Sequence, residues 1–113
     1  MNNESFSSLK ASILAALSAD NPHKTAALIN EFLIAFPDRP EPLYFDGLRA
    51  LLAGDNIKAK ERLSLALGFD PGNINVLLNL AVAHQRTGEL GLAIAYYCSA
   101  RQIDPKNLQV LIN

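Results

Sequence analysis

The sequence predicts an all-α solenoid in which three helical hairpins stack side by side. Prolines recur every 34 residues, at Pro37, Pro71 and Pro105, and each lies between two apolar stretches with helix-like spacing. A fixed period of this length is typical of repeat proteins, in which each repeat is one supersecondary unit. Half of the 113 residues are hydrophobic, enough for one continuous core. The predicted organisation is a single domain, 1–113, with repeats at 6–39, 40–73 and 74–107.

The first repeat should form two helices, over 5–19 and 22–35. Apolar residues recur at helical spacing in both stretches, and Ser5 is a suitable N-terminal cap for the first. Asn21 offers a cap for the second helix, and Pro22 suits its first turn, where no backbone N–H is needed. Pro37 then stops that helix, because proline removes a donor and clashes with the preceding turn.

The second and third repeats follow one common pattern. We expect helices over 42–53 and 56–68, then over 74–86 and 90–103, after a rigid connector at 38–42. A glycine lies between the two helices of each hairpin, where a left-handed backbone is often required. Small residues seven positions apart should let the paired helices approach closely. These residues are Gly54 and Gly88 in the turns, and Ala59, Ala66, Ala93 and Ala100 on the helices.

The third repeat resembles the tetratricopeptide repeat, which has a large apolar residue, Leu and a small residue before the turn and Ala, an aromatic, Ala and Pro after it. The matching residues are Leu77, Leu80, Ala81, Gly88, Ala93, Tyr97, Ala100 and Pro105. The second repeat matches through Leu43, Gly47, Ala50, Gly54, Ala59, Leu63, Ala66 and Pro71. The resemblance implies a right-handed superhelical solenoid of about three helix-turn-helix repeats.

The departures from this pattern are largest in the first repeat. Thr25 and Phe32 stand where the family has alanines, and an Asp-Asn-Pro sequence replaces the turn glycine. In the second repeat, Asp46 occupies a position where an apolar residue is expected. Leucine replaces the family's tryptophan in all three repeats, at positions 9, 43 and 77.

The resemblance also implies a concave groove lined by the first helix of each pair. An apolar stripe there would suit an amphipathic helix or an apolar extended segment of a partner protein. The other interpretation is ordinary solenoid core, with Leu17 and Leu51 the first candidates for burial. The predicted groove residues are Leu17, Tyr44, Leu48, Leu51, Leu78, Val82, Gln85 and Arg86, of which Tyr44, Leu48, Leu78 and Val82 would be the anchors.

These features favour a non-enzymatic protein-interaction module that acts as a chaperone or adaptor. In size, repeat number and groove character the chain is similar to type III secretion chaperones of Gram-negative bacteria. Tetratricopeptide domains that capture acidic chaperone tails instead use Lys, Arg and Asn in the groove. Lys10 and Asn79 could each imitate one member of that clamp, but Leu14 and Phe45 replace its two asparagines. An apolar group cannot bind a carboxylate, so we do not expect a clamp.

The C-terminal residues suggest a second interaction surface. Solenoids usually end in a helix with a polar outer face, whereas 108–113 is rich in large aliphatic residues. The chain could be a piece of a larger tetratricopeptide assembly protein, a terminal turn could pack back, or a partner could cover this edge. The alternative function is therefore self-association into a homodimer or longer stack, and its predicted contacts are Leu108, Leu111 and Ile112.

Composition argues against several other classes of protein. A net charge of −1 offers no basic patch for nucleic acid or anionic membrane. No apolar run would span a bilayer, no signal peptide is apparent and one cysteine precludes an intramolecular disulfide, so we expect a cytoplasmic protein. His84 should pack between helices, and Cys98 is interpreted as a small structural residue. No metal, cofactor or catalytic residue is predicted.

Overall fold

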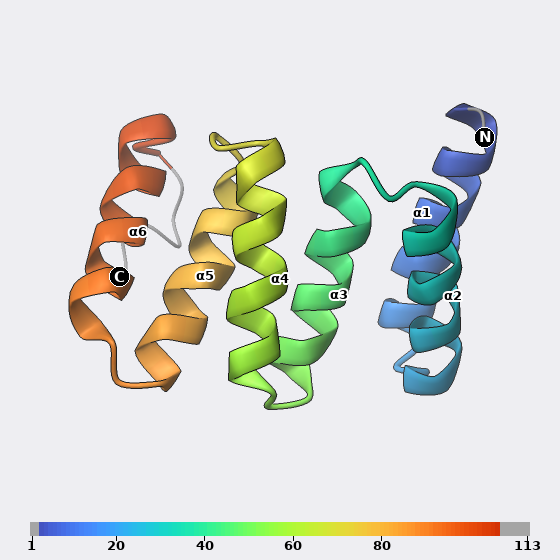
Figure 1. Ribbon diagram of the computed structural model, residues 1–113, viewed down its shortest axis with the longest axis horizontal. Helices are drawn as coiled ribbons and strands as arrows, with labels where there is room; N and C mark the ends of the chain where they lie inside the picture. Colours follow the sequence, from blue (N-terminus) through green and yellow to red (C-terminus); the bar gives the residue numbers. More distant parts are fainter. Residues whose placement is uncertain (1–2, 107–113) are drawn as a thin grey trace.

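The computed structural model describes residues 3–106, which form six α-helices arranged as three hairpins in a row (Figure 1). Consecutive hairpins stack against one another, so the second helix of one repeat packs on the first helix of the next. This arrangement confirms the all-α helical solenoid. The helices are α1 (Asn3–Ser18), α2 (Pro22–Ala35), α3 (Pro40–Leu52), α4 (Asn56–Phe69), α5 (Ile74–Arg86) and α6 (Leu90–Ile103).

Side-chain caps begin α2, α4 and α5, and the cap of α2 at Asn21 is the one that the sequence predicts. The side chains of Asn21, Asp55 and Asn73 accept hydrogen bonds from backbone N–H groups three residues later, at 3.2, 3.1 and 3.2 Å. Each bond satisfies a donor that the helix itself leaves free. Ser5 was expected to cap the first helix, but it lies inside α1, which begins at Asn3.

The predicted connector at 38–42 is too long, because α3 already begins at Pro40. Both Pro40 and Pro42 lie in the first turn of the helix, where backbone N–H groups have no intrahelical acceptor. Proline therefore costs no hydrogen bond there, and its fixed φ suits the helix. The prolines start α3 instead of delaying it.

The hairpin turns share one backbone conformation with different residues. Gly54 and Gly88 have φ values of 83° and 80°, in the left-handed region that glycine enters without steric cost. Asp20 lies at the equivalent place in the first repeat and has φ 52°. Aspartate is one of the few other residues that tolerate this conformation, which explains how the first hairpin closes without a glycine.

The close approach of paired helices is confirmed in the second and third repeats. Ala59, Ala66 and Ala100 have no exposed surface, and Ala93 is 3% exposed. Leu63 fills the space between α3 and α4 and is also fully buried. Small residues thus bring the helix axes together, and in the second hairpin Leu63 fills the gap that remains.

An aromatic cluster replaces those alanines in the first repeat. The Phe32 ring lies 5.0 Å from Phe6, 5.8 Å from Phe36 and 6.3 Å from Phe45, measured between ring centroids. The guanidinium of Arg39 covers the Phe6 ring at 4.6 Å. Phe32 was an irregularity in the repeat pattern, and here it is the centre of the core that joins the first repeat to the second.

Asp46, the polar residue at an apolar repeat position, is buried and paired with two arginines. Its carboxylate oxygens lie 2.8 Å from Arg49 Nη2 and 3.2 Å from Arg62 Nε. The aspartate side chain is 3% exposed, whereas both arginines keep about a third of their surface in solvent. The pair with Arg62 joins α3 to α4, so a charge cluster holds the second hairpin at a position where the third repeat has the buried Leu80.

Candidate functional site

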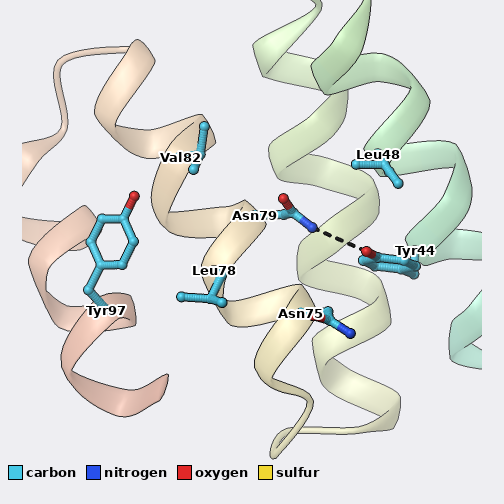
Figure 2. A pocket seen from close by; sticks show the side chains of 7 residues that line it. All are labelled: Tyr44, Leu48, Asn75, Leu78, Asn79, Val82 and Tyr97. Atoms are coloured by element: carbon cyan, nitrogen blue, oxygen red, sulfur yellow. Dashed lines mark hydrogen bonds between the residues drawn. The ribbon is translucent and has the colours of Figure 1, made fainter. Parts of the chain in front are cut away.

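Two adjoining cavities form a groove along the first helices of the three repeats. The first has a volume of about 280 Å³ and lies between α3, α5 and α6 (Figure 2). The second has a volume of about 310 Å³ and lies between α1, α3 and the start of α5. Tyr44, Leu48 and Asn75 line both cavities, so the groove is continuous. We call the two parts the α3–α5 cavity and the α1–α3 cavity.

The α3–α5 cavity combines apolar walls with two amides on one helix face. Leu48, Leu78 and Val82 supply aliphatic surface, and Tyr97 closes the side formed by α6. Asn75 and Asn79 lie four residues apart on α5, so their amides point into the same space. An amide side chain can donate to and accept from a peptide backbone. The cavity therefore offers both an apolar pocket and hydrogen-bonding groups.

A hydrogen bond crosses the floor of the groove between α5 and α3. Asn79 Nδ2 donates to the Tyr44 hydroxyl over 3.3 Å (Figure 2). Burial raises the pKa of the Tyr44 hydroxyl above its usual value, and the Asn79 hydrogen bond acts in the opposite direction. Burial also raises the pKa of Tyr97. Both phenols stay protonated near neutral pH, so they act as neutral donors and acceptors.

The α1–α3 cavity contains one residue of each charge sign among its lining groups, Lys10 and Glu41. Leu14, Leu17 and Phe45 supply the apolar part of this wall. Glu41 Oε1 is buried and has no hydrogen-bond partner among residues 3–106. The Glu41 carboxylate and the Lys10 ammonium group give this end of the groove one acidic and one basic group.

Five of the eight predicted groove residues line one or both of these cavities. The four proposed anchors line the α3–α5 cavity, and Leu17 lines the α1–α3 cavity. The prediction that Leu51 lines the groove is wrong, because Leu51 is 5% exposed and packs in the core with Leu63 and Leu80. The next residue, Leu52, is 70% exposed.

Gln85 and Arg86 are exposed and do not line either cavity. Gln85 Oε1 accepts a hydrogen bond of 3.4 Å from the Tyr97 hydroxyl. Arg86 Nη1 donates to the Leu51 carbonyl oxygen at 3.0 Å, so its guanidinium connects α5 to the end of α3. The structure gives Arg86 a role between repeats that the sequence pattern does not show.

His84 and Cys98, which the sequence also singles out, do not line either cavity. His84 is buried and stacks on Tyr96 at 5.3 Å, which confirms that it packs between helices. Cys98 is exposed, so it does not fill space in the core. Within residues 3–106, no three His, Cys, Asp or Glu side chains gather as metal ligands. None of the helices in this range is long and apolar enough to cross a membrane.

The predicted self-association contacts, Leu108, Leu111 and Ile112, lie outside the described residues. The neighbouring helix, α6, does show exposed apolar side chains. Leu90, Ile94 and Ile103 are 59%, 62% and 49% exposed. The last described helix therefore exposes apolar surface.

Searches by sequence give no match to a protein-family profile or to a curated protein. The structure itself is similar to several solved tetratricopeptide domains. The TPR domain of Arabidopsis OM64 superposes with a TM-score of 0.88 at 16% identity, covering 96% of this chain and 90% of that one. The first TPR of Spaghetti (RPAP3), bound to the HSP90 peptide SRMEEVD, gives 0.89 at 13% identity, with 98% and 88% covered.

A third similar structure belongs to a much larger protein. The O-GlcNAc transferase of Thermobaculum terrenum superposes with a TM-score of 0.90 at 20% identity, covering 97% of this chain but 22% of that one. Such identities establish the fold and leave the activity open. The repeat pattern, the hairpin geometry and these superpositions agree that the chain has the tetratricopeptide-repeat fold.

Proposed function

We propose that this protein is a non-enzymatic interaction module that binds an apolar segment of a partner protein in its groove. The observation that carries the proposal is the α3–α5 cavity, where Leu48, Leu78 and Val82 border the amides of Asn75 and Asn79. Apolar walls supply binding energy, and precisely placed amides orient a backbone. The resulting role is that of a chaperone or adaptor.

The chemistry of the groove indicates what the partner segment should contain. An aliphatic or aromatic side chain would occupy the α3–α5 cavity, next to Asn79. A donor such as a backbone N–H or a cationic side chain would pair with the Glu41 carboxylate in the α1–α3 cavity. An amphipathic helix or an extended segment that carries both an apolar side chain and such a donor would meet both conditions.

An acidic tail like the peptide bound by RPAP3 is a poor fit to this groove. Among the residues lining the two cavities, Lys10 is the single basic side chain, and Glu41 would repel a carboxylate. Leu14 and Phe45 add apolar surface where an acidic ligand would need donors. We therefore propose an apolar partner segment in preference to an acidic one.

A type III secretion chaperone is the more specific form of this proposal. Support comes from three short hairpins and a groove suited to the apolar helix of an export substrate. Adaptors within larger assemblies would use the same groove, so the identity of the partner separates these roles. A cytoplasmic location follows from either role and is part of the proposal.

The experiment compares bait proteins that differ only on the groove or on the outer surface. Leu48→Asp and Val82→Asp place a charge in the α3–α5 cavity, and Ile34→Asp is the control because Ile34 is 82% exposed on α2. Partners captured from the native source are quantified by mass spectrometry, and a synthetic segment of the leading candidate is titrated by calorimetry. Loss of a buried anchor should cost about 2 kcal/mol or more, roughly 30-fold in affinity.

The proposal requires one partner that Ile34→Asp retains and both groove variants lose, with helicity by circular dichroism unchanged. A partner that binds all three baits equally would contradict groove binding. If helicity collapses in the groove variants, Leu48 and Val82 are core residues and the groove interpretation is wrong.

The second candidate function is self-association through the C-terminal edge. The exposed apolar residues Leu90 and Ile94, one turn apart on α6, favour it, because their burial by a second copy would remove apolar surface from water. Sedimentation equilibrium of the chain, of Ile94→Lys and of a variant lacking residues 108–113 tests this role. A monomeric mass for the unchanged chain at high concentration would rule it out.

A further inference from the structure

The joint between the second and third repeats is held by polar contacts near the hairpin turns. Arg86 Nη1 donates to the Leu51 carbonyl oxygen at 3.0 Å. Lys60 Nζ lies 3.2 Å from Thr87 Oγ1 and 2.6 Å from Glu89 Oε1. These contacts join α4 and the end of α3 to the turn between α5 and α6. They hold the two repeats together at the end of their interface that lies next to the hairpin turns.

At the interface between the first and second repeats, the residues equivalent to Arg86, Thr87, Lys60 and Glu89 are all different. Thirty-four residues earlier, Arg86 becomes Leu52, Thr87 becomes Ala53 and Lys60 becomes Ala26. None of these three side chains can donate or accept a hydrogen bond. Glu89 becomes Asp55, whose carboxylate caps its own helix by accepting from Lys58 N. The side-chain hydrogen bonds between the second and third repeats therefore have no counterpart at the equivalent positions between the first and second.

A cavity of about 280 Å³ lies where those hydrogen bonds would be. It is bordered by Leu17, Pro22 and Thr25 of the first repeat and by Arg49, Leu52 and Ala53 of the second. Arg49 does not bridge the two sides, because its guanidinium pairs with Asp46 of its own helix. Leu52 is 70% exposed, so it covers little of the facing surface.

The opposite end of the same joint is tightly closed. Phe45 of the second repeat packs with Ile13, Ile29, Phe32 and Phe36 of the first. Arg39, in the connector between α2 and α3, lies over the rings of Phe6 and Phe36 at 4.6 and 5.5 Å. In Figure 1 this connector is at the top of the array, and the hairpin turns are at the bottom.

We infer that the first repeat is hinged on the rest of the array. The aromatic cluster around Phe32 is the fixed pivot, and the interface next to the hairpin turns opens and closes. An element with few interactions at one end moves at low cost there, while a packed end stays fixed. The movement changes the separation of α1 from α3, and thus the width of the α1–α3 cavity. The α3–α5 cavity keeps its width, because Arg86 and the Asn79–Tyr44 hydrogen bond connect its two sides.

The consequence for binding rests on the proposed function, while the hinge itself does not. A partner segment would first find its apolar pocket in the fixed α3–α5 cavity. The first repeat would then adjust to the side chains that follow, through Lys10, Leu14 and Leu17 of α1. Segments of different bulk could share one groove in this way.

Distance measurements between spin labels test the hinge with a built-in control. His23, Ile57 and Gly91 are exposed, lie 34 residues apart and are the second residues of α2, α4 and α6. In a Cys98→Ser background, the pair His23→Cys and Ile57→Cys spans the first joint, and the pair Ile57→Cys and Gly91→Cys spans the second. Pulsed electron–electron double resonance should give a wider distance distribution for the first pair than for the second. Equal widths would overturn the inference.

A second experiment introduces the polar side chains of the second interface into the first. Ala26→Lys, Leu52→Arg and Ala53→Thr, introduced together, place the residues of the second joint at the first. The distribution for labels at 23 and 57 should then narrow to the width seen for 57 and 91. A folded variant whose distribution stays wide would show that the missing hydrogen bonds do not cause the movement. Because no partner is present, failure of groove binding would leave these results unchanged.

Discussion

Gly47 in α3 lies so close to Leu63 in α4 that a Cβ atom at residue 47 would be 2.7 Å from Leu63 Cγ. It would also be 3.3 Å from the Leu63 backbone nitrogen, and Leu63 is fully buried. The leucine therefore cannot turn away without moving its helix. Glycine at this position sets the distance between α3 and α4.

We expect Gly47→Ala to lower the free energy of unfolding by up to about 2 kcal/mol. Overpacking of a filled core costs about 1–3 kcal/mol, and the better helix propensity of alanine returns about 1 kcal/mol. Urea unfolding followed by circular dichroism measures the change. Gly68→Ala in α4 is the matched control, because a Cβ there has no neighbour within 4 Å, and it should be neutral or stabilising. Equal effects of the two changes would contradict the close contact.

Removal of Asp46 should lower the free energy of unfolding more than removal of Arg62 does. Asp46→Ala leaves two arginines without their shared carboxylate and should cost about 2–3 kcal/mol, less than for a fully buried pair because both arginines reach solvent. Arg62→Met should cost about 1 kcal/mol, since Arg49 still pairs with the aspartate. Denaturant unfolding of both single variants and the double variant measures their coupling. Strictly additive costs would show that the pair across α3 and α4 contributes nothing.

The fold could be predicted closely because its determinants are local. The prolines, turn glycines and buried alanines act through backbone geometry and short spacings, and the sequence displays both directly. The start of α3 was missed because proline both ends and begins helices. The first repeat looked degenerate because its core depends on aromatic rings from three helices, and such a cluster leaves no periodic signal.

The groove was harder to predict because one residue along a helix turns the side chain by about 100°. Leu51 and Leu52 show this directly, since one is buried and its neighbour is exposed. The contacts of Arg86 and Lys60 with the neighbouring repeat join residues 27 to 35 positions apart. Such contacts depend on the rotamers of long side chains, which helical periodicity does not determine.

The hydrogen bond between Asn79 and Tyr44 should be visible in the titration of the phenol. Because the amide donates to the hydroxyl oxygen, it stabilises the phenolate and acts to lower the pKa of Tyr44. Asn79→Ala removes this effect, so the pKa of Tyr44 should rise further above its usual value. Carbon-13 resonances of labelled tyrosine rings report each phenol separately, and Tyr44→Phe assigns the signal. No movement of the Tyr44 signal in Asn79→Ala would contradict the bond.

Stability at low pH should depend on Glu89, which joins α4 to the turn between α5 and α6. Hydrogen bonds from Lys60, then Thr87 and His84, lower the pKa of Glu89 from 4.5 to about 2. A carboxylate with a lowered pKa in the folded state stabilises it above the unfolded pKa, and the contribution is lost as the pH falls from about 4.5 to 2. Glu89→Gln resembles the protonated form, so its unfolding midpoint in urea should approach that of the unchanged chain over this range.

Lys60 identifies the source of that pH dependence, because its hydrogen bond is the largest cause of the lowered pKa. In a Lys60→Met background, the carboxylate of Glu89 loses its strongest partner at 2.6 Å. The difference in midpoint between Glu and Gln at residue 89 should then be smaller near neutral pH and should change less on acidification. Glu89 is solvent-exposed, so added salt should reduce the effect in the same way. A difference that stays constant with pH in the unchanged background would show that the Lys60–Glu89 contact does not stabilise the joint.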